Sequence, residues 1–403
     1  METEYLLQLG IILIATKASG ILMKAIGMPQ VVGALVAGII VGPMVFGLVQ
    51  SSDVLDIIAE IGVIMIIFSA GLETNVKELK KTGKASLVIA AGGVIVPLIL
   101  GFLIAALFHG GFNFDRAELI KNIFFGLILT ATSISIAVQT LKELGKLKSK
   151  SGTIILSAAI IDDIIGIIMV SIMLGFNNAA INPWITIGKT LLFFALLVIV
   201  GIPIHKLFKY FSGKYPRNRR IPIFALGICL ILAYVAEKVF GVADITGAYF
   251  AGVIFSGISV SSYIERKIDI NSYMFFAPVF FAYIGIKASF VDFDASLILF
   301  ALAFVSIGII SKIIGCYSTS RMCHLDRQDS KTIAFAMIAR GEVALVVMQK
   351  AVNESIIESK YLAVVVALVI ATSIIAPILL KLTSKNDTQN NIIGSPTNII
   401  PQA

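Results

Sequence analysis

The sequence predicts an all-α polytopic membrane protein, and its composition is the first reason. Of the 403 residues, 58% are hydrophobic and only 14% are charged, and the mean hydropathy is +0.97. A soluble chain of this length needs about a quarter of its residues charged to cover its surface. The composition therefore excludes a soluble enzyme, a disordered chain and a disulfide scaffold.

Thirteen apolar stretches divide the chain, each long enough to cross about 30 Å of hydrocarbon with roughly 20 residues. They lie near residues 5–26, 30–48, 53–72, 85–108, 120–141, 151–175, 183–205, 220–240, 243–261, 270–291, 295–316, 330–350 and 360–382. We expect thirteen transmembrane helices within a transmembrane domain of residues 1–382. The polar segment 383–403 has little to bury and is expected to be a disordered cytoplasmic tail.

Lysine and arginine are distributed unevenly between the two predicted sides of the membrane. With the N-terminus outside, 23 of the 32 fall in cytoplasmic segments, Lys312 among them, five fall in outer segments and four within spans. Cytoplasmic loops retain Lys and Arg during insertion. The sequence thus predicts a multi-pass protein of the bacterial inner membrane with its C-terminus in the cytoplasm. The net charge of +8 reflects topology, and no nucleic-acid partner is expected.

The odd number of spans predicts an inverted repeat. If 183–205 is a linker helix, the segments 5–175 and 220–382 each hold six spans, which enter the membrane from opposite sides. The fifth span of each repeat loses its apolar continuity, at residues 130–133 and at residues 340–342. Polar groups at these positions can serve an unwound segment by satisfying open backbone hydrogen bonds. Regular helices stay open as the alternative, because Ser and Thr also occur in them.

Two adjacent carboxylates, Asp162 and Asp163, lie near the middle of the sixth span, about 18 Å from its expected cytoplasmic edge. An acidic residue at the membrane centre costs about 2.5–3.5 kcal/mol, so it needs a partner, water or a function. Adjacent residues point about 100° apart on a helix, so the two carboxylates have different neighbours. With the oxygens of Thr130, Thr132 and Ser133, they are candidate ligands for a hard cation such as Na+.

Three further ionisable residues are candidates for compensating charge at this site, namely Lys287, Arg340 and Glu342. Arginine does not deprotonate in practice, so Arg340 is expected to be a fixed electrostatic or structural element. Lysine can release a proton when buried, although Lys287 could instead extend to the interface as an anchoring residue. Glu342 is expected to pair with Arg340.

No pattern in the sequence calls for a cofactor. Cys316, Cys323 and His324 fit no standard zinc spacing. No glycine-rich phosphate loop follows a strand, and the tail is too short for a regulatory nucleotide-binding domain. The expected partners are membrane lipid and, as described next, a second copy of the chain.

Four segments together resemble the bacterial monovalent cation:proton antiporter-2 family, in particular its NapA-type Na+/H+ antiporters. They are Asp162-Asp163, residues 130–133, Gly285-Ile286-Lys287 and Ala339-Arg340-Gly341-Glu342. The resemblance implies a NhaA-like fold with two crossed unwound helices, and a homodimer. It also implies that Asp163 is the main ion and proton carrier and that Asp162 pairs with Lys287.

The paired carboxylates predict a secondary active antiporter and not an enzyme. Protons or a cation can neutralise such a site, whereas an empty, doubly ionised site is costly to carry through a low-dielectric barrier. Only loaded states should therefore move, and Na+ or Li+, or else K+, would be exchanged for protons by alternating access. The alternatives are a K+/H+ antiporter, a Na+-coupled symporter of an organic anion, and a non-transporting receptor or sensor subunit.

Overall fold

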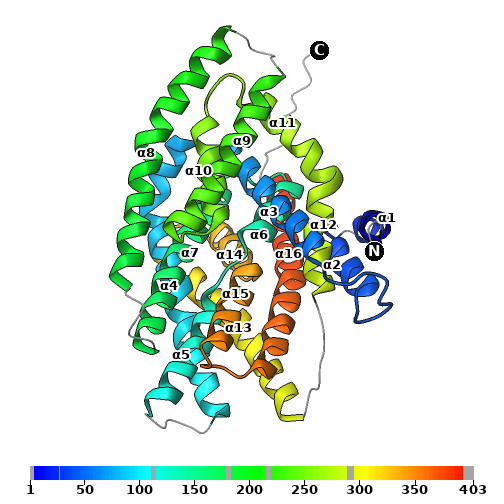
Figure 1. Cartoon of the computed structure of the whole chain (residues 1–403), viewed down its shortest axis with the longest axis vertical. Coiled ribbons are helices and arrows are strands. Elements are labelled where there is room, and N and C mark those ends of the chain that lie inside the picture. The colour runs from blue at the N-terminus through cyan, green and yellow to red at the C-terminus, as the bar shows by residue number, and fades with distance from the viewer. Residues whose placement is uncertain are drawn as a thin grey trace.

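The computed structural model is helical, and it describes residues 4–26, 28–109, 115–177, 183–214, 219–287 and 295–393 (Figure 1). In chain order its elements are α1 (Glu4–Ala25), α2 (Gln30–Val41), α3 (Asp53–Glu73), α4 (Val76–Phe108), α5 (Arg116–Thr130), α6 (Ile134–Glu143), α7 (Lys150–Asn177), α8 (Pro183–Lys214), α9 (Arg220–Tyr234), the π-helix η1 (Val235–Phe240), α10 (Asp244–Phe255), α11 (Ser261–Asn271), the π-helix η2 (Ser272–Phe276), α12 (Ala277–Ile286), α13 (Ala295–Met322), α14 (Arg327–Ala336), α15 (Glu342–Asn353), the 3-10 helix η3 (Ser359–Tyr361) and α16 (Leu362–Ile393).

The described residues contain ten helical segments that are long and apolar enough to cross a membrane, and three shorter apolar helices. The protein is therefore an all-helical, multi-pass membrane protein. At its C-terminal end, α16 continues to Ile393, past residue 383 where the tail was expected to begin. Residues 394–403 of that tail lie outside the described part of the chain.

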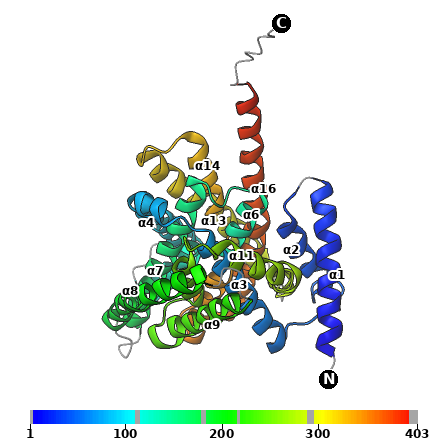
Figure 2. The ribbon, with the colours of Figure 1, turned by 90° about the horizontal axis from the view of Figure 1, so that it is seen from above.

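The helices form two groups, each packed internally. The first bundle consists of α1, α2, α3, α9, η1, α10, α11, η2 and α12, and the second bundle consists of α4, α5, α6, α7, α13, α14, α15, η3 and α16. Figure 2 shows α1 and α2 on one side of the molecule and α4 and α7 on the other. The long helix α8 packs against α7 and α10, and α6 borders α2 and α3 of the first bundle.

Glycines permit the closest helix approaches within each bundle. Gly252 of α10 faces Gly71 of α3, and a Cβ on Gly252 would lie 2.4 Å from the carbonyl oxygen of Phe68. In the second bundle, a Cβ on Gly315 of α13 would lie 2.4 Å from the carbonyl oxygen of Gly92 on α4. Small residues let membrane helices pack backbone to backbone. Among the described glycines, such approaches occur inside one bundle, and none joins the first bundle to the second.

Both helix interruptions expected from the sequence are present. Residues 131–133 separate α5 from α6, and residues 337–341 separate α14 from α15. The backbone N–H of Ser133 donates to the carbonyl oxygen of Ala339 at 2.7 Å, so the two unwound segments meet. Four helix ends, two N-terminal and two C-terminal, therefore come together inside the second bundle.

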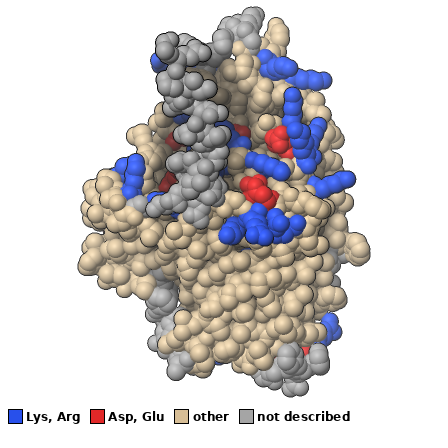
Figure 3. All heavy atoms as spheres, turned by 180° about the vertical axis from the view of Figure 1, so that it is seen from behind, with Lys and Arg blue, Asp and Glu red and all other residues tan. Residues whose placement is uncertain are grey.

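Positive side chains are concentrated toward one end of the molecule. Figure 3 shows Lys and Arg gathered over the upper part of one face, with few on the surface below. The helices α8 and α9 meet at this upper end, to which they bring Lys206, Lys209, Arg219 and Arg220. We refer to it below as the basic end.

Candidate functional site

The meeting point of the two unwound segments is held by hydrogen bonds with side-chain hydroxyls of another helix, α16. The N–H of Arg340 donates to Thr372 Oγ1 at 3.2 Å, and Ser373 Oγ donates to the carbonyl oxygen of Arg340 at 2.9 Å. Both hydroxyls come from α16 and are fully buried. Backbone groups outside a helix must find partners when no water is available. The two hydroxyls of α16 supply them at Arg340.

The Arg340 side chain connects the ends of two helices. Its guanidinium donates to the carbonyl oxygens of Ile338 at 2.6 Å, Leu129 at 2.7 Å and Gly308 at 2.8 Å. The last carbonyls of a helix have no partner within the helix, and they form the negative end of its dipole. Leu129 lies at the C-terminal end of α5, and Ile338 follows that of α14. Arg340, which is fully buried, thus contacts both ends.

Asp162 lies beside this meeting point, in the middle of α7. Its Oδ2 accepts hydrogen bonds from Thr132 Oγ1 at 2.5 Å and from Lys312 Nζ at 2.8 Å. The side chains of the Asp162–Lys312 pair are 1% and 0% exposed. Oδ1 of the same carboxylate is also buried, yet it accepts no hydrogen bond from the part of the chain that the structure describes.

The prediction that Asp162 pairs with Lys287 was wrong. Lys287 directly follows α12, and its Nζ lies 2.8 Å from Oδ1 of Asp56 near the start of α3. Both side chains are substantially exposed, at 41% and 52%. Lys287 therefore lies at an exposed position beside the start of α3, away from the buried Asp162.

Lys312 was assigned to a cytoplasmic segment in the sequence analysis, although it is the partner of Asp162. The apolar stretch ends near residue 316, which places Lys312 close to a helix end. In the structure α13 continues through polar residues to Met322, so Lys312 lies about 15 Å from that end. A depth count from Arg321, the first arginine after Lys312, would have indicated its burial.

The hydroxyls predicted around the site have different partners. Thr132 contacts Asp162 directly, as described above. Thr130 Oγ1 donates back to the carbonyl oxygen of Leu127 at 2.7 Å, within its own helix. Ser133 Oγ lies 3.0 Å from Ser135 Oγ. Thr132 is thus the hydroxyl at the carboxylate, while Thr130 and Ser133 stabilise the two ends of the interruption.

Two other predicted site residues are placed less fully. Asp163 is buried, with 3% of its surface exposed, one position along α7 from Asp162. Glu342 is the first residue of α15, and its side chain lies outside the described part of the structure. The predicted pairing of Glu342 with Arg340 therefore stays a prediction.

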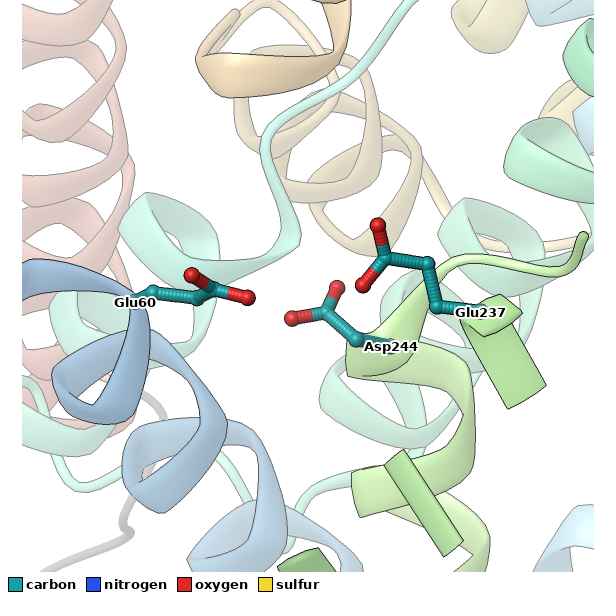
Figure 4. Close-up of side chains that lie close together, drawn as sticks. All are labelled: Glu60, Glu237 and Asp244. Atoms are coloured by element: carbon teal, nitrogen blue, oxygen red, sulfur yellow. The ribbon is translucent and has the colours of Figure 1, made fainter. Parts of the chain in front are cut away.

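Two triads of carboxylates occur away from this site within the described residues. The first consists of Glu60 on α3, Glu237 on η1 and Asp244 on α10. Figure 4 shows Glu60 and Asp244 pointing toward each other, with the Glu237 carboxylate beside Asp244. All three belong to helices next to one another in the first bundle. The second triad, Glu73, Glu265 and Asp269, borders the second bundle and is described below.

The site combines buried charges of both signs with oxygen atoms suited to a hard cation. Carboxylate, hydroxyl and carbonyl oxygens are the ligands that such cations prefer. A buried carboxylate can be neutralised by a proton, by a lysine or by a cation, and these compete for the same oxygens. The arrangement brings together the groups that a cation- and proton-binding centre in a membrane transporter would use.

The family described as "Sodium/hydrogen exchanger, transmembrane" matches residues 11–385. The chain is 36% identical over 384 residues to the Na(+)/H(+)-K(+) antiporter GerN of Bacillus cereus, with 95% of this chain and 97% of GerN covered. It is 31% identical over 386 residues to the Na(+)/H(+) antiporter of Enterococcus hirae, with 95% and 98% covered. The fold is similar to that of the sodium proton antiporter MjNhaP1 from Methanocaldococcus jannaschii at pH 8, with a TM-score of 0.69 and 17% identity over 97% of this chain and 100% of that one.

The chain therefore belongs to the sodium/hydrogen exchanger family. It is a monovalent cation:proton antiporter, a transporter and not an enzyme. A non-transporting receptor or sensor subunit is not favoured.

Proposed function

We propose that this protein exchanges Na+ or Li+ for protons at a site formed by Asp162 and Asp163. The observation that supports the proposal is the state of the Asp162 carboxylate. One oxygen is bound by Lys312 and Thr132, and the other is buried with no hydrogen bond from the described residues. A cation that binds Asp163 and this second oxygen would enter a site already lined by hard ligands.

In this proposal Asp163 is the main ion and proton carrier. Asp162 is bound either by Lys312 or by the cation, so it couples cation binding to the protonation of the lysine. When a cation takes Asp162, the Lys312 ammonium loses its partner in a water-free interior, which costs several kcal/mol. Release of the lysine proton removes that cost. Each cycle would then move two protons, one on Asp163 and one on Lys312, against one monovalent cation. Arg340 keeps its charge throughout and positions the interrupted helices.

The wider architecture of the antiporter is part of the same proposal. The ten long and three shorter apolar segments correspond to thirteen spans if α14 and α15 together form the twelfth. The concentration of Lys and Arg at the basic end supports a cytoplasmic location for that end. We further propose an outside N-terminus, inverted repeats joined by α8, a location in the bacterial inner membrane and a lipid-embedded homodimer.

Labelling of single cysteines tests this orientation. A cysteine at Arg219 should react only with reagents that cross the membrane, whereas a cysteine at Arg116 should react from outside intact cells. The opposite pattern would reverse the proposed orientation while leaving the fold as described.

A K+/H+ exchanger is the second candidate, because the relative GerN is named a Na(+)/H(+)-K(+) antiporter. Purified protein in liposomes that contain a trapped pH dye separates the candidates when Na+, Li+ and K+ are added one at a time. The cations that change the internal pH are the substrates.

The Asp163→Asn variant tests the site in the same liposomes. Asn keeps the shape and hydrogen bonding of Asp but cannot titrate, so exchange should fall to background, while Asp162→Asn should be less severe. Cation-dependent proton movement that persists in Asp163→Asn would remove Asp163 from the mechanism.

A further inference from the structure

The last turn of α6 is attached to the first bundle by an ion-pair network. Lys142 Nζ lies 2.6 Å from Asp269 Oδ1 on α11 and 3.3 Å from Glu73 Oε1 at the end of α3. Ser69 Oγ of α3 donates to the same Asp269 oxygen at 2.6 Å and accepts from Lys142 at 3.0 Å. One lysine of the second bundle thus joins two helices of the first.

A second lysine extends the network. Lys148, in the connection between α6 and α7, lies 3.6 Å from Glu73 Oε2 and 3.9 Å from Glu265 Oε1. One oxygen from each of Glu73, Glu265 and Asp269 lies within 4.8 Å of the other two. Three carboxylates this close repel one another unless positive charge lies between them. The two lysines of the second bundle supply that charge.

The residue after Lys142 contacts the first bundle on another helix. Glu143 Oε2 accepts a hydrogen bond from the backbone N–H of Gln30, the first residue of α2, at 2.7 Å. Consecutive residues of α6 therefore reach α2 with one side chain and α3 and α11 with the other. No described glycine brings the backbones of the two bundles into the close contact found inside each bundle.

The network borders a cavity beside α7, the helix that carries Asp162. A cavity of about 200 Å³ is lined by Glu73 and Asn75 on one side and by Lys148, Thr153 and Leu156 on the other. Thr153 and Leu156 belong to α7, which places Leu156 six residues, about 9 Å, before Asp162. Thr132, which binds Asp162, lies at the other end of the short helix α6 from Lys142.

We propose that Lys142 and Lys148, together with Glu73, Glu265 and Asp269, form a gate between the bundles on the basic-end side. While the five residues are paired, α6 and α7 are held against α3 and α11, and the cavity does not extend to Asp162. Access from the basic end requires the second bundle to move and both lysines to leave the triad. This inference rests on alternating access at the proposed site.

Thiol labelling of purified protein in detergent tests the gate without any transport. The reporter is Thr153→Cys, a nearly isosteric change in the cavity wall, in a chain whose native Cys229, Cys316 and Cys323 are replaced by alanine. Lys142→Gln and Asp269→Asn should each raise the rate of reaction with a water-soluble maleimide about fivefold. This corresponds to about 1 kcal/mol, since 1.4 kcal/mol is tenfold.

Three matched variants separate a gate from general loosening. The exchanged pair Lys142→Asp with Asp269→Lys, and the conservative Lys142→Arg, should react at the rate of the parent chain. Glu60→Gln alters the carboxylate triad that lies within the first bundle, and should also leave the rate unchanged. Size-exclusion chromatography identifies any variant that has lost its fold. Lys142→Gln and Asp269→Asn break the same ion pair from opposite sides, so either variant can test the gate if the other does not fold.

An unchanged labelling rate in both Lys142→Gln and Asp269→Asn would overturn the gate, as would an equal rise in Glu60→Gln. These outcomes are distinct from failure of the proposed exchange. A protein that shows no cation-dependent proton movement but responds to Lys142→Gln as expected would retain the gate and lose the proposed cargo.

Discussion

Two lysine–aspartate pairs in this protein have the same length and opposite surroundings. Lys312 and Asp162 lie 2.8 Å apart with almost no exposed surface, and Lys287 and Asp56 lie 2.8 Å apart with about half of each side chain in contact with the exterior. In the exposed pair, solvent screens the charges and each side chain can find other partners. In the buried pair, each charge depends on the other, because neither has water to replace its partner.

The comparison shows that a short distance alone does not identify a functional pair. Exposed ion pairs of this kind contribute about 0–1 kcal/mol to the free energy of unfolding. The buried pair makes the protonation or loading of one residue change the free energy of the other, which is the property that an exchanger needs. The two pairs have the same N–O distance and differ in how deeply they are buried.

The largest expected effect is the loss of stability when the lysine of the buried pair is removed, compared with removal of the lysine of the exposed pair. Lys312→Met leaves the Asp162 carboxylate buried without its counter-charge, and should destabilise the protein by about 3–5 kcal/mol. Lys287→Met should cost less than about 1 kcal/mol. Thermal unfolding in detergent measures both. Equal losses of stability for the two variants would contradict the difference in burial.

A smaller effect is expected when both members of the buried pair are neutralised together. Asp162→Asn with Lys312→Met removes both charges, so much of the stability lost in Lys312→Met should return, by about 1–4 kcal/mol. In the matched double variant Asp56→Asn with Lys287→Met, the two changes should simply add. A double-mutant cycle on thermal stability gives both coupling energies, and a coupling near zero for the buried pair would show that the two charges act independently.

The voltage dependence of exchange distinguishes the two lysines functionally. If Lys312 carries the second proton, an imposed potential should drive exchange, with about 2.3 kcal/mol per uncompensated charge per 100 mV. Lys312→Gln should stop exchange or make it insensitive to potential, whereas Lys287→Gln should behave like the parent protein. Proton flux in liposomes with a valinomycin-set potential records this. Potential-driven exchange that survives Lys312→Gln would assign the second proton elsewhere.

The smallest effect concerns salt. Screening shortens the range of charge interactions from about 10 Å at 0.1 M to about 3 Å at 1 M, and it acts on exposed charges. The coupling energy of Lys287 with Asp56 should therefore fall toward zero between these concentrations, while that of Lys312 with Asp162 should persist. The same double-mutant cycles, repeated in choline chloride, provide the measurement, and a salt-sensitive buried pair would indicate that water reaches it.

Hydropathy and broken apolar patterns predict much of the fold, because insertion into lipid requires long apolar helices and leaves few alternatives. Polar positions within apolar stretches predicted interruptions at 130–133 and 340–342, and the structure has them at 131–133 and 337–341. Helix ends were less predictable. Polar residues extend α13 to Met322, and the apolar stretch near 30–48 is helical only as far as Val41.

The candidate site was predictable where its members are close in sequence or individually costly. Asp162, Thr132 and Arg340 could be identified because a buried charge or an unwound helix requires an explanation at that position. The partner of Asp162 could not be identified in this way, because 150 residues separate it from Lys312 and their contact depends on how α7 packs in the finished bundle. From the sequence, Lys287 was predicted to be the counter-charge and Lys312 was assigned to a cytoplasmic segment, whereas Lys312 is buried in the structure and Lys287 is exposed.

The separation of Asp162 from Lys312 also has a consequence for how the protein is made. The ribosome completes α7 about 150 residues before α13 exists, so Asp162 must enter the membrane ahead of its lysine. Each aspartate opposes insertion by about 2.5–3.5 kcal/mol at a helix centre, whereas each isoleucine favours it by about 0.3–0.6 kcal/mol. The flanking isoleucines of α7, at positions 154, 155, 160, 161, 164, 165, 167 and 168, offset part of that opposition. The isoleucine-rich sequence of α7 thus helps this helix to remain in the bilayer after Asp162 has been synthesised and before Lys312 is present.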